Sequence, residues 1–137
     1  MGCFPFFVDL AGEPGLIVGG GKVAARKIQK LLPYGPRLTV IAPETGAAVR
    51  ETEGLILLER PYRPEDLDGD WRFVIAATDC RAVNREIALR CRERRILVDV
   101  ADGGEEGSFL FPALVKRGRL SVGVSTGGAS PTAAASV

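Results

Sequence analysis

The sequence predicts an α/β fold with a doubly wound, mostly parallel sheet and an antiparallel C-terminal strand pair. Three observations support this prediction. Between residues 16 and 100, short apolar runs alternate with segments of helical periodicity. A glycine-rich turn joins the first apolar run directly to the first helical segment, and after Asp102 two strand-like runs follow each other without a helix. Such alternation is typical of parallel strands joined by right-handed crossovers.

The chain opens with a segment that predicts an edge strand. Residues 4–10 combine aromatic side chains with Pro5, which lacks the N–H group that a central strand needs. An apolar run and then an amphipathic stretch follow, with apolar side chains at helical spacing. In order, we expect a strand at 16–18, a helix at 22–32, a strand at 38–42, a short helix at 45–53 capped by Thr45, and a strand at 55–59.

The second half repeats the pattern and then departs from it. In order, we expect one helical turn at 65–67, a strand at 73–77, a helix at 81–94, and strands at 96–100, 108–112 and 120–125. A hairpin through residues 116–119 is the simplest link between the last two, so we expect them to be antiparallel. Ser130 and Pro131 predict the start of a helix, but only six residues follow. We therefore expect a truncated C-terminal helical region, from a chain cut at a domain edge or, alternatively, from a frayed natural terminus.

Composition and charge exclude several classes of protein. The 137 residues suffice for about one domain with its own core, and 46% apolar and 26% charged residues are ordinary for a globular protein. A net charge of +1 gives no reason to expect nucleic acid or a membrane surface as partner. No apolar run approaches the roughly 20 residues that span a bilayer. The N-terminus lacks the basic region of a signal peptide, so we expect a cytoplasmic protein.

Cysteine spacing and the absence of histidine limit the chemistry. Cys3, Cys80 and Cys91 are scattered and show no C-x-x-C spacing, so we expect packing residues rather than disulfides or zinc ligands. With no histidine in the chain, a Ser-His-Asp triad and His-ligated zinc are excluded. Proton transfer must therefore use carboxylates, tyrosines, lysines, cysteines or backbone.

The glycine cluster carries the first functional signal. Gly19, Gly21 and Ala24 fit G-x-G-x-x-A, the dinucleotide fingerprint of Rossmann-like sheets. The first glycine permits a tight turn, the second lets a pyrophosphate approach bare backbone, and the alanine lets the helix pack close to the sheet. Amides and dipole at the helix N-terminus favour phosphates. The pattern favours dinucleotide binding over a purely structural turn.

Ligands of such a sheet bind beyond the carboxyl ends of its strands. Four segments are expected there: residues 19–23, 42–44, 78–79 and 102–104. The acid that usually holds the ribose lies about 20 residues past the fingerprint. Glu44 comes slightly late, after Pro43, so either Glu44 or the backbone at 42–43 is expected to reach the ribose. Arg37 begins the same strand at its opposite end and cannot serve a 2′-phosphate, which favours NAD over NADP.

Two aspartates follow strands at this edge. Asp79 is more readily interpreted as the cap of the helix at 81–94 than as a functional group. Asp102 is either a turn residue before Gly103 or, in a chain without histidine, the candidate general base or cation ligand. The arginines between residues 90 and 95 are interpreted as a solvated helix face.

An ordered set of motifs extends along nearly the whole chain. It comprises residues 4–7, 16–27, 38–43, 76–79 with Val83-Asn84, 98–102, Ser108-Phe109 with Pro112, and 124–131. With this set the chain resembles the N-terminal NAD-binding domain of siroheme synthases and of stand-alone precorrin-2 dehydrogenase/sirohydrochlorin ferrochelatases. The glycine loop alone is shared by many folds, whereas the ordered set is specific.

The resemblance implies an enzyme of siroheme or cobalamin biosynthesis, in which precorrin-2 passes a hydride to NAD and becomes sirohydrochlorin. Some members also insert ferrous iron as a ferrochelatase. The important aspartate of the family matches Asp102, as the catalytic residue for proton removal and metal handling. Cofactor contacts of the family match Gly19, Gly20, Gly21, Lys22, Val23, Pro43, Glu44 and Thr78. Family members are homodimers whose substrate cleft is partly built by a helical C-terminal region.

The resemblance also suggests a domain division. Residues 1–112 are expected to form the NAD-binding Rossmann domain and 113–137 the start of a dimerisation or substrate region, which the family continues with a helix and a further domain. Location alone suggests that the substrate's carboxylates are held by Arg81, Arg85, Lys116 and Arg117.

Two other functions compete with this one. A nucleotide-sensing domain that gates potassium transport would share the core, but such sensors usually carry an acid at the end of the second strand, which Ala42-Pro43 does not supply. An unrelated NAD dehydrogenase for a small substrate is less favoured, because histidine and a substrate domain are lacking.

Overall fold

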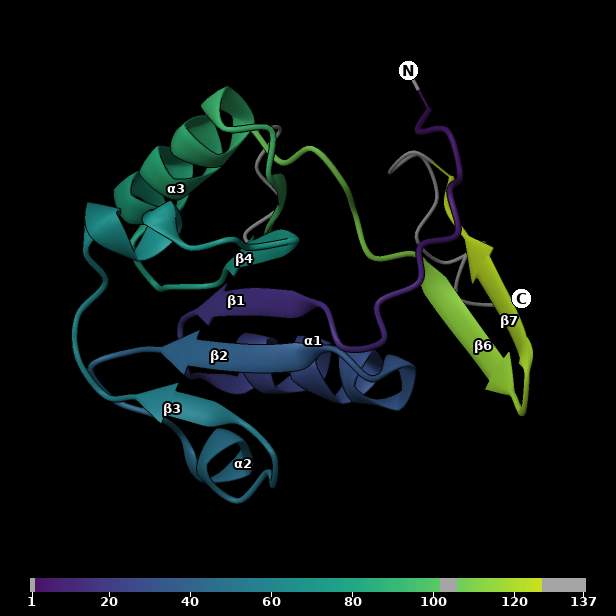
Figure 1. The fold of residues 1–137 in the computed structure, drawn as a ribbon, viewed down its shortest axis with the longest axis horizontal. Helices are drawn as coiled ribbons and strands as arrows, with labels where there is room; N and C mark the ends of the chain where they lie inside the picture. The colour runs from purple at the N-terminus through teal and green to yellow at the C-terminus, as the bar shows by residue number, and fades with distance from the viewer. Residues whose placement is uncertain (1, 102–105, 127–137) are drawn as a thin grey trace. The chain divides into compact units, whose positions relative to one another are not determined.

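The computed structural model describes residues 2–101 and 106–126 (Figure 1). Contacts divide the chain into a larger unit, Asp9–Ser108, and a smaller unit formed by the residues before and after it. The expected functional boundary at residue 112 remains a prediction, as does the role given to residues 113–137. The C-terminal helix expected from Pro131 lies outside the described residues.

A five-stranded sheet organises the larger unit. Its strands are β1 (Pro14–Val18), β2 (Arg37–Ile41), β3 (Ile56–Leu58), β4 (Phe73–Ala76) and β5 (Leu97–Val100). Their spatial order is β3-β2-β1-β4-β5, and every neighbouring pair is parallel. The chain reverses its direction of travel across the sheet between β1 and β4, which lie side by side at the centre (Figure 1). In open α/β sheets this switch point is where ligands bind.

Helices cover both faces of the sheet, which confirms the doubly wound architecture. The helical elements are α1 (Lys22–Leu31), α2 (Ala47–Arg50), α3 (Arg81–Glu93) and the 3₁₀ turns η1 (Leu32–Tyr34) and η2 (Pro64–Asp68). On one face, α3 and η2 contribute Leu67 and Ile87 to a core with Leu16 and Val74, all fully buried. Side chains alternate along a strand, so Ile17 points to the opposite face, which α1 covers (Figure 1).

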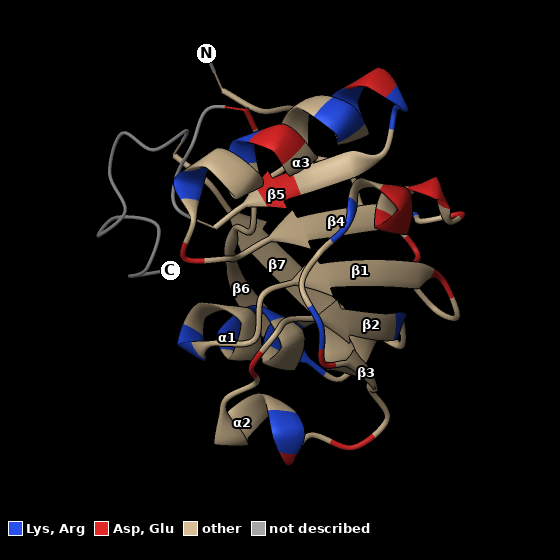
Figure 2. Ribbon diagram, turned by 90° about the vertical axis from the view of Figure 1, so that its left-hand side faces the viewer, with Lys and Arg blue, Asp and Glu red and all other residues tan. Residues whose placement is uncertain are grey.

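An ion pair joins α1 to the edge strand β5. Lys27 Nζ lies 2.6 Å from Asp99 Oδ2, and the two side chains are only 18% and 9% exposed. Asp99 is the one charged residue of β5, and the red band on that strand in Figure 2 marks its place in the ribbon. The helix α1 therefore has this partly buried ion pair in addition to its apolar face.

The smaller unit contains an antiparallel strand pair, as expected. The pair is formed by β6 (Ala113–Arg117) and β7 (Leu120–Val124). They are joined by a two-residue turn that begins at Gly118, where φ is +56°. A positive φ at the first turn position matches the right-handed twist of a hairpin and favours glycine there.

Some expected elements are wrong. No strand forms at 4–10; Phe4 and Phe6 in this segment are 78% and 81% exposed, and the edges of the sheet are β3 and β5 instead. The strand expected at 108–112 is absent, and Ser108 instead forms two hydrogen bonds with Val98 of β5. Its N–H donates to Val98 O at 2.7 Å and its Oγ accepts from Val98 N at 3.0 Å. The first strand of the pair begins only at Ala113, after Pro112.

The helix-cap expectation for Thr45 is also wrong. The residue before α2 is Gly46, in an extended conformation and without a side-chain cap. The predicted helix 45–53 shrinks to the single turn of α2. No helix among the described residues has the length and apolar character that a membrane span requires.

Candidate functional site

The carboxyl ends of β1 and β4 meet at Gly19. Its N–H donates to Ile41 O of β2 at 2.9 Å, and Ala77 N donates to Val18 O at 2.8 Å. Gly19 has a φ of +125°, and a Cβ there would run into the carbonyl group of Ala77. Only glycine satisfies both the backbone angle and the contact. This residue therefore closes the turn at the switch point.

Gly20 joins the glycine loop to the segment after β2. A Cβ on Gly20 would lie 2.8 Å from the Glu44 carbonyl oxygen and 3.0 Å from Thr45 Cα. Gly46 N donates to Gly20 O at 2.8 Å. The two loops pack backbone to backbone, so the structure brings two separately predicted segments, 19–23 and 42–44, to one place.

Gly21 is the N-cap of α1 and differs from its neighbours. Its φ is −90°, it is exposed, and nothing lies within 4 Å of the position that its Cβ would take. The N-terminus of α1 has no side-chain cap and no acid in its first turn. First-turn amides have no partner within a helix, so those of exposed Lys22 and Val23 are suited to an anion. Open space beside uncapped amides fits the pyrophosphate of a dinucleotide.

The segment after β2 carries the expected ribose contacts. Pro43 and Glu44 are both exposed, on the side of β1 away from β4. Arg50 Nη2 holds the loop by donating to Thr45 O at 2.6 Å. At the other end of β2, the Arg37 Nε donates to Gly12 O at 2.9 Å. Arg37 therefore lies away from the candidate site, as its place in the strand predicts.

The segment after β4 is fixed by Asn84, for which the sequence predicts no role beyond its place in a family motif. Asn84 is 1% exposed and forms three hydrogen bonds to Thr78, a predicted cofactor contact. The expectation that Asp79 caps α3 is wrong: the N-cap is Cys80, with no side-chain cap, and Asp79 is exposed. The Thr78 hydroxyl instead accepts from Cys80 N at 3.2 Å.

The catalytic candidate, Asp102, lies outside the described residues, together with Gly103 and Gly104. The structure does describe the residue before it. Ala101 N donates to Ala76 O of β4 at 2.9 Å, one step beyond the last paired residues of β4 and β5. The chain thus leaves the sheet at its carboxyl edge, the same edge as the glycine loop.

The arginine-rich end of α3 has defined partners, although its side chains face solvent. Arg92 donates to the carbonyls of Glu106 and Gly107 at 2.6 and 2.8 Å. Arg94 Nη2 lies 3.1 Å from Oδ1 of Asp68, the last residue of η2. These contacts hold the segments that flank α3. Arg85, suggested for substrate carboxylates, is 68% exposed and lies 3.9 Å from Glu106 Oε1.

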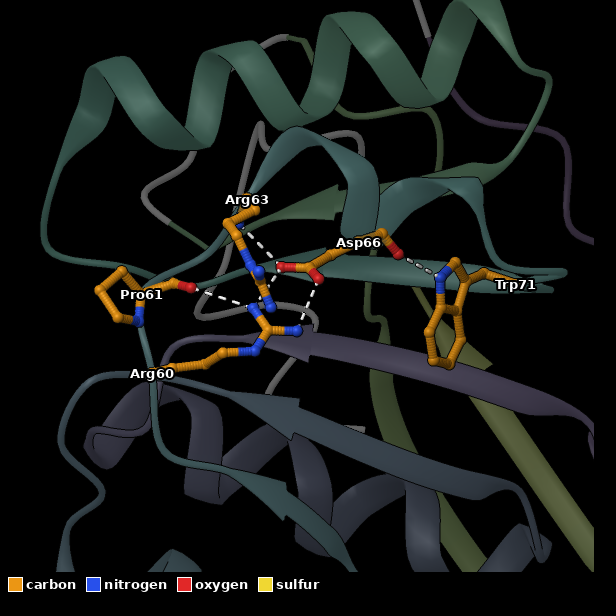
Figure 3. Close-up of polar contacts among 5 residues, drawn as sticks. All are labelled: Arg60, Pro61, Arg63, Asp66 and Trp71. Carbon is orange, nitrogen blue, oxygen red and sulfur yellow. Dashed lines mark hydrogen bonds and ion pairs between the residues drawn. The ribbon is translucent and has the colours of Figure 1, made fainter.

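A polar cluster fixes the crossover from β3 to β4 (Figure 3). Arg60 donates to both carboxylate oxygens of Asp66, at 2.7 and 2.9 Å, and Arg63 N donates to Asp66 Oδ2 at 2.8 Å. Trp71 Nε1 donates to Asp66 O at 2.8 Å. The hydrogen bond from Arg60 is the main cause that lowers the pKa of Asp66, against the opposing effect of burial. The cluster is structural, since its charges pair with each other.

Two other side chains have raised pKa values but belong to the core. Burial raises the pKa of Tyr62 to about 12 and that of the Cys91 thiol to about 11. Both pack with the apolar cluster beneath α3. Neither ionises near neutral pH, so neither is suited to proton transfer there. The cysteines carry free thiols, with Cys91 buried and Cys3 and Cys80 exposed.

Comparison with known proteins places this geometry among nucleotide-binding domains. Residues 6–113 match the family described as "Putative NAD(P)-binding". The chain is 44% identical over 137 residues to the siroheme synthase of Methylococcus capsulatus, and 42% identical to that of Chromobacterium violaceum. Each alignment covers 98% of this chain and 29% of the relative, so the chain spans less than a third of the length of these curated relatives.

A solved structure is similar as well. The structure of SirC, a precorrin-2 dehydrogenase, superposes with a TM-score of 0.81 at 34% identity, over 98% of this chain and 67% of that chain. The expected Rossmann-like architecture is therefore shared with a nicotinamide-dependent class of proteins.

Proposed function

This chain belongs to the NAD(P)-binding family, and we propose that it is the dehydrogenase part of an enzyme of siroheme biosynthesis, which oxidises precorrin-2 to sirohydrochlorin with NAD. The observation that carries the proposal is the similarity of nearly the whole chain to SirC and to siroheme synthases. The exposed Gly21 beside the uncapped α1 supports it independently. The alternative of a nucleotide-sensing domain gains no support from the comparisons.

The strand that each predicted contact residue follows suggests which part of the cofactor it binds. Gly19 and Gly20 close the loop without side chains, and the amides of Gly21, Lys22 and Val23 bind the pyrophosphate. On the β2 side, Pro43 and Glu44 contact the adenosine ribose, while Thr78 on the β4 side contacts the nicotinamide half. The carboxylate of Glu44 would repel a 2′-phosphate, and Arg37 is bound at the far end of the strand; both favour NAD.

The chemistry divides between cofactor and protein. Bound NAD supplies the hydride acceptor. The protein must orient the tetrapyrrole and remove protons from it. Asp102 is the proposed base, because it directly follows Ala101, whose N–H donates a hydrogen bond to Ala76 O at the carboxyl edge of the sheet. Some members of the family insert ferrous iron into the product, and we extend that activity to this enzyme as a second step with iron as substrate.

A homodimer is part of the proposal. The smaller unit has large apolar side chains that are strongly exposed, such as Phe6 at 81% and Leu120 at 60%. A two-stranded sheet such as β6-β7 is marginal without further packing. A second copy of the chain would cover this surface.

The activity is tested with the full-length protein that carries this chain. Under anaerobic conditions with precorrin-2 and NAD, we expect NADH to form, measured by its absorbance. Absence of NADH would overturn the proposed activity. The variant Asp102→Ala should abolish turnover and leave NAD affinity nearly unchanged, because the base acts on the tetrapyrrole. Asp79→Ala is the matched control, since Asp79 is an exposed aspartate at the same edge; it should keep full turnover. Collapse of NAD binding in Asp102→Ala would make Asp102 a structural residue instead.

A further inference from the structure

We propose that Asn84 is a positioning residue that turns the Thr78 hydroxyl into a pure hydrogen-bond acceptor, directed at a donor on the nicotinamide half of the cofactor. The inference rests on the proposed dinucleotide binding and specifies the chemistry of one contact within it. Asn84 itself touches no ligand in this scheme. It acts through Thr78.

The first step is the orientation of the Asn84 amide. Thr78 N lies 3.1 Å from Asn84 Oδ1, and Asn84 Nδ2 lies 3.0 Å from Thr78 O. A backbone N–H must face an oxygen and a carbonyl must face an NH₂ group, so the pattern allows only one orientation of the amide. Because Asn84 is 1% exposed, water does not compete for these positions.

The second step is the direction of the Thr78 hydroxyl. Its Oγ1 lies 2.6 Å from Asn84 Oδ1 and 3.1 Å from Cys80 O, and both of these atoms are acceptors only. The single hydroxyl proton therefore stays inside the loop, mainly on the shorter bond to Asn84. Cys80 N donates to Thr78 Oγ1 at 3.2 Å and occupies one lone pair. For any further partner, the half-buried Thr78 hydroxyl therefore has one lone pair left, which can only accept a hydrogen bond.

The third step is the identity of the group that this lone pair can bind. A phosphate or carboxylate oxygen would meet another acceptor and be repelled. The cofactor's donors are its ribose hydroxyls and its carboxamide NH₂ group. Thr78 follows β4, whereas Glu44 follows β2, and these strands flank β1 on opposite sides. With the pyrophosphate at α1 between them, Thr78 faces the half of the dinucleotide that carries the nicotinamide.

The experiment measures binding of three ligands to the full chain by calorimetry: ADP, ADP-ribose and NAD. Thr78→Val keeps the shape and the backbone bonds to Asn84 but removes the hydroxyl. We expect about tenfold weaker NAD binding, the value of one hydrogen bond, with ADP binding unchanged. If ADP-ribose weakens equally, the donor is the ribose hydroxyl; if only NAD weakens, it is the carboxamide. Thr78→Ser keeps the hydroxyl and should retain wild-type affinity. Asp70→Asn is the control that should change none of the three, because Asp70 is exposed and precedes β4, at the end of the strand opposite Thr78.

Asn84→Ala tests the positioning role. It removes the closer acceptor of the hydroxyl proton and leaves only the Cys80 carbonyl at 3.1 Å. The hydroxyl is then held less firmly, so the variant should show a selective loss of NAD affinity that is smaller than that of Thr78→Val, while ADP binding is retained. A purely structural role for Asn84 would weaken ADP and NAD binding together, or neither, and would overturn the inference. If Asn84→Ala does not fold, Thr78→Val decides: unchanged NAD affinity in that variant overturns the inference. If the wild type binds neither ADP nor NAD, the proposed function itself fails.

Discussion

The loops after β1 and β4, which lie at the switch point, are held in shape in opposite ways. Both follow central parallel strands and both lead into a helix. The loop after β1 makes room by omitting side chains at Gly19, Gly20 and Gly21. The loop after β4 holds its shape by means of side chains, through the buried amide of Asn84 on Thr78. A loop without side chains is suited to close approach by a ligand, whereas a loop held by side chains can set the direction of a single polar group.

The largest expected effect is the loss of folding in Gly19→Ala. A φ of +125° is strained for any residue with a Cβ, and that Cβ would also collide with the Ala77 carbonyl. We expect the free energy of unfolding to fall by about 3 kcal/mol or more, measured by urea denaturation. A Gly19→Ala protein of wild-type stability would contradict the close approach of β1 and β4. It would also contradict the view that the loop after β1 requires residues without side chains.

A smaller effect, mainly on binding, is expected for Gly21→Val. The position has an ordinary φ of −90° and open space around its Cβ, so the protein should still fold. Because valine is less favourable than glycine at a helix N-cap, we expect the free energy of unfolding to fall by about 1 kcal/mol. The side chain would occupy the approach of the pyrophosphate, and NAD affinity should fall about 100-fold, or about 2.7 kcal/mol. Calorimetric titration with NAD measures it. Unaltered affinity would remove the fingerprint from the functional argument, while Gly21→Ala, with a smaller side chain, should lie between the wild type and Gly21→Val.

The same contrast explains what could be predicted from the sequence. The glycine loop is a local pattern: its residues are adjacent, and each apolar run before a turn predicts a buried strand, as at Leu16–Val18 and Phe73–Ala76. The loop after β4 depends on two residues six positions apart, and no periodicity connects them. The end of the strand and the family motif predict that Thr78 lies at the site. The contact of Thr78 with Asn84 is visible only in the folded structure, where α3 holds Asn84 against the residues after β4.

Errors of the sequence analysis have a related origin. The N-cap is the residue directly before the first helical residue, so an error of one residue in the start of a helix changes which residue is the cap. The cap predicted at Thr45 moved to Gly46, and the one predicted at Asp79 moved to Cys80. In place of the strand predicted at 108–112, Ser108 forms two hydrogen bonds with Val98, and the next strand begins only at Ala113. Local patterns predict elements; contacts between distant residues decide their ends.

The smallest expected effect is a pH dependence of stability. It distinguishes the crossover before β4, which is held by a charged side chain, from the loop after β4, which is held by neutral ones. The crossover before β4 depends on the carboxylate of Asp66, whose pKa is lowered from its ordinary 3.8, chiefly by the hydrogen bond from Arg60. The folded state therefore binds this proton more weakly than the unfolded state does. Asp66 contributes stability at pH values above 3.8, and that contribution is lost as the pH falls through the lowered pKa of the folded protein.

Asp66→Asn tests this directly, because the amide keeps acceptor capacity but cannot titrate. We expect the wild type to be more stable than Asp66→Asn at neutral pH and the difference to shrink below pH 3.8, as measured by urea midpoints across the pH range. The corresponding difference between Thr78→Val and the wild type should stay constant over the same range, because the Thr78–Asn84 contact is neutral. A Thr78→Val difference that follows pH as Asp66→Asn does would show that the loop after β4 also depends on charge, and the distinction between the two loops would be lost.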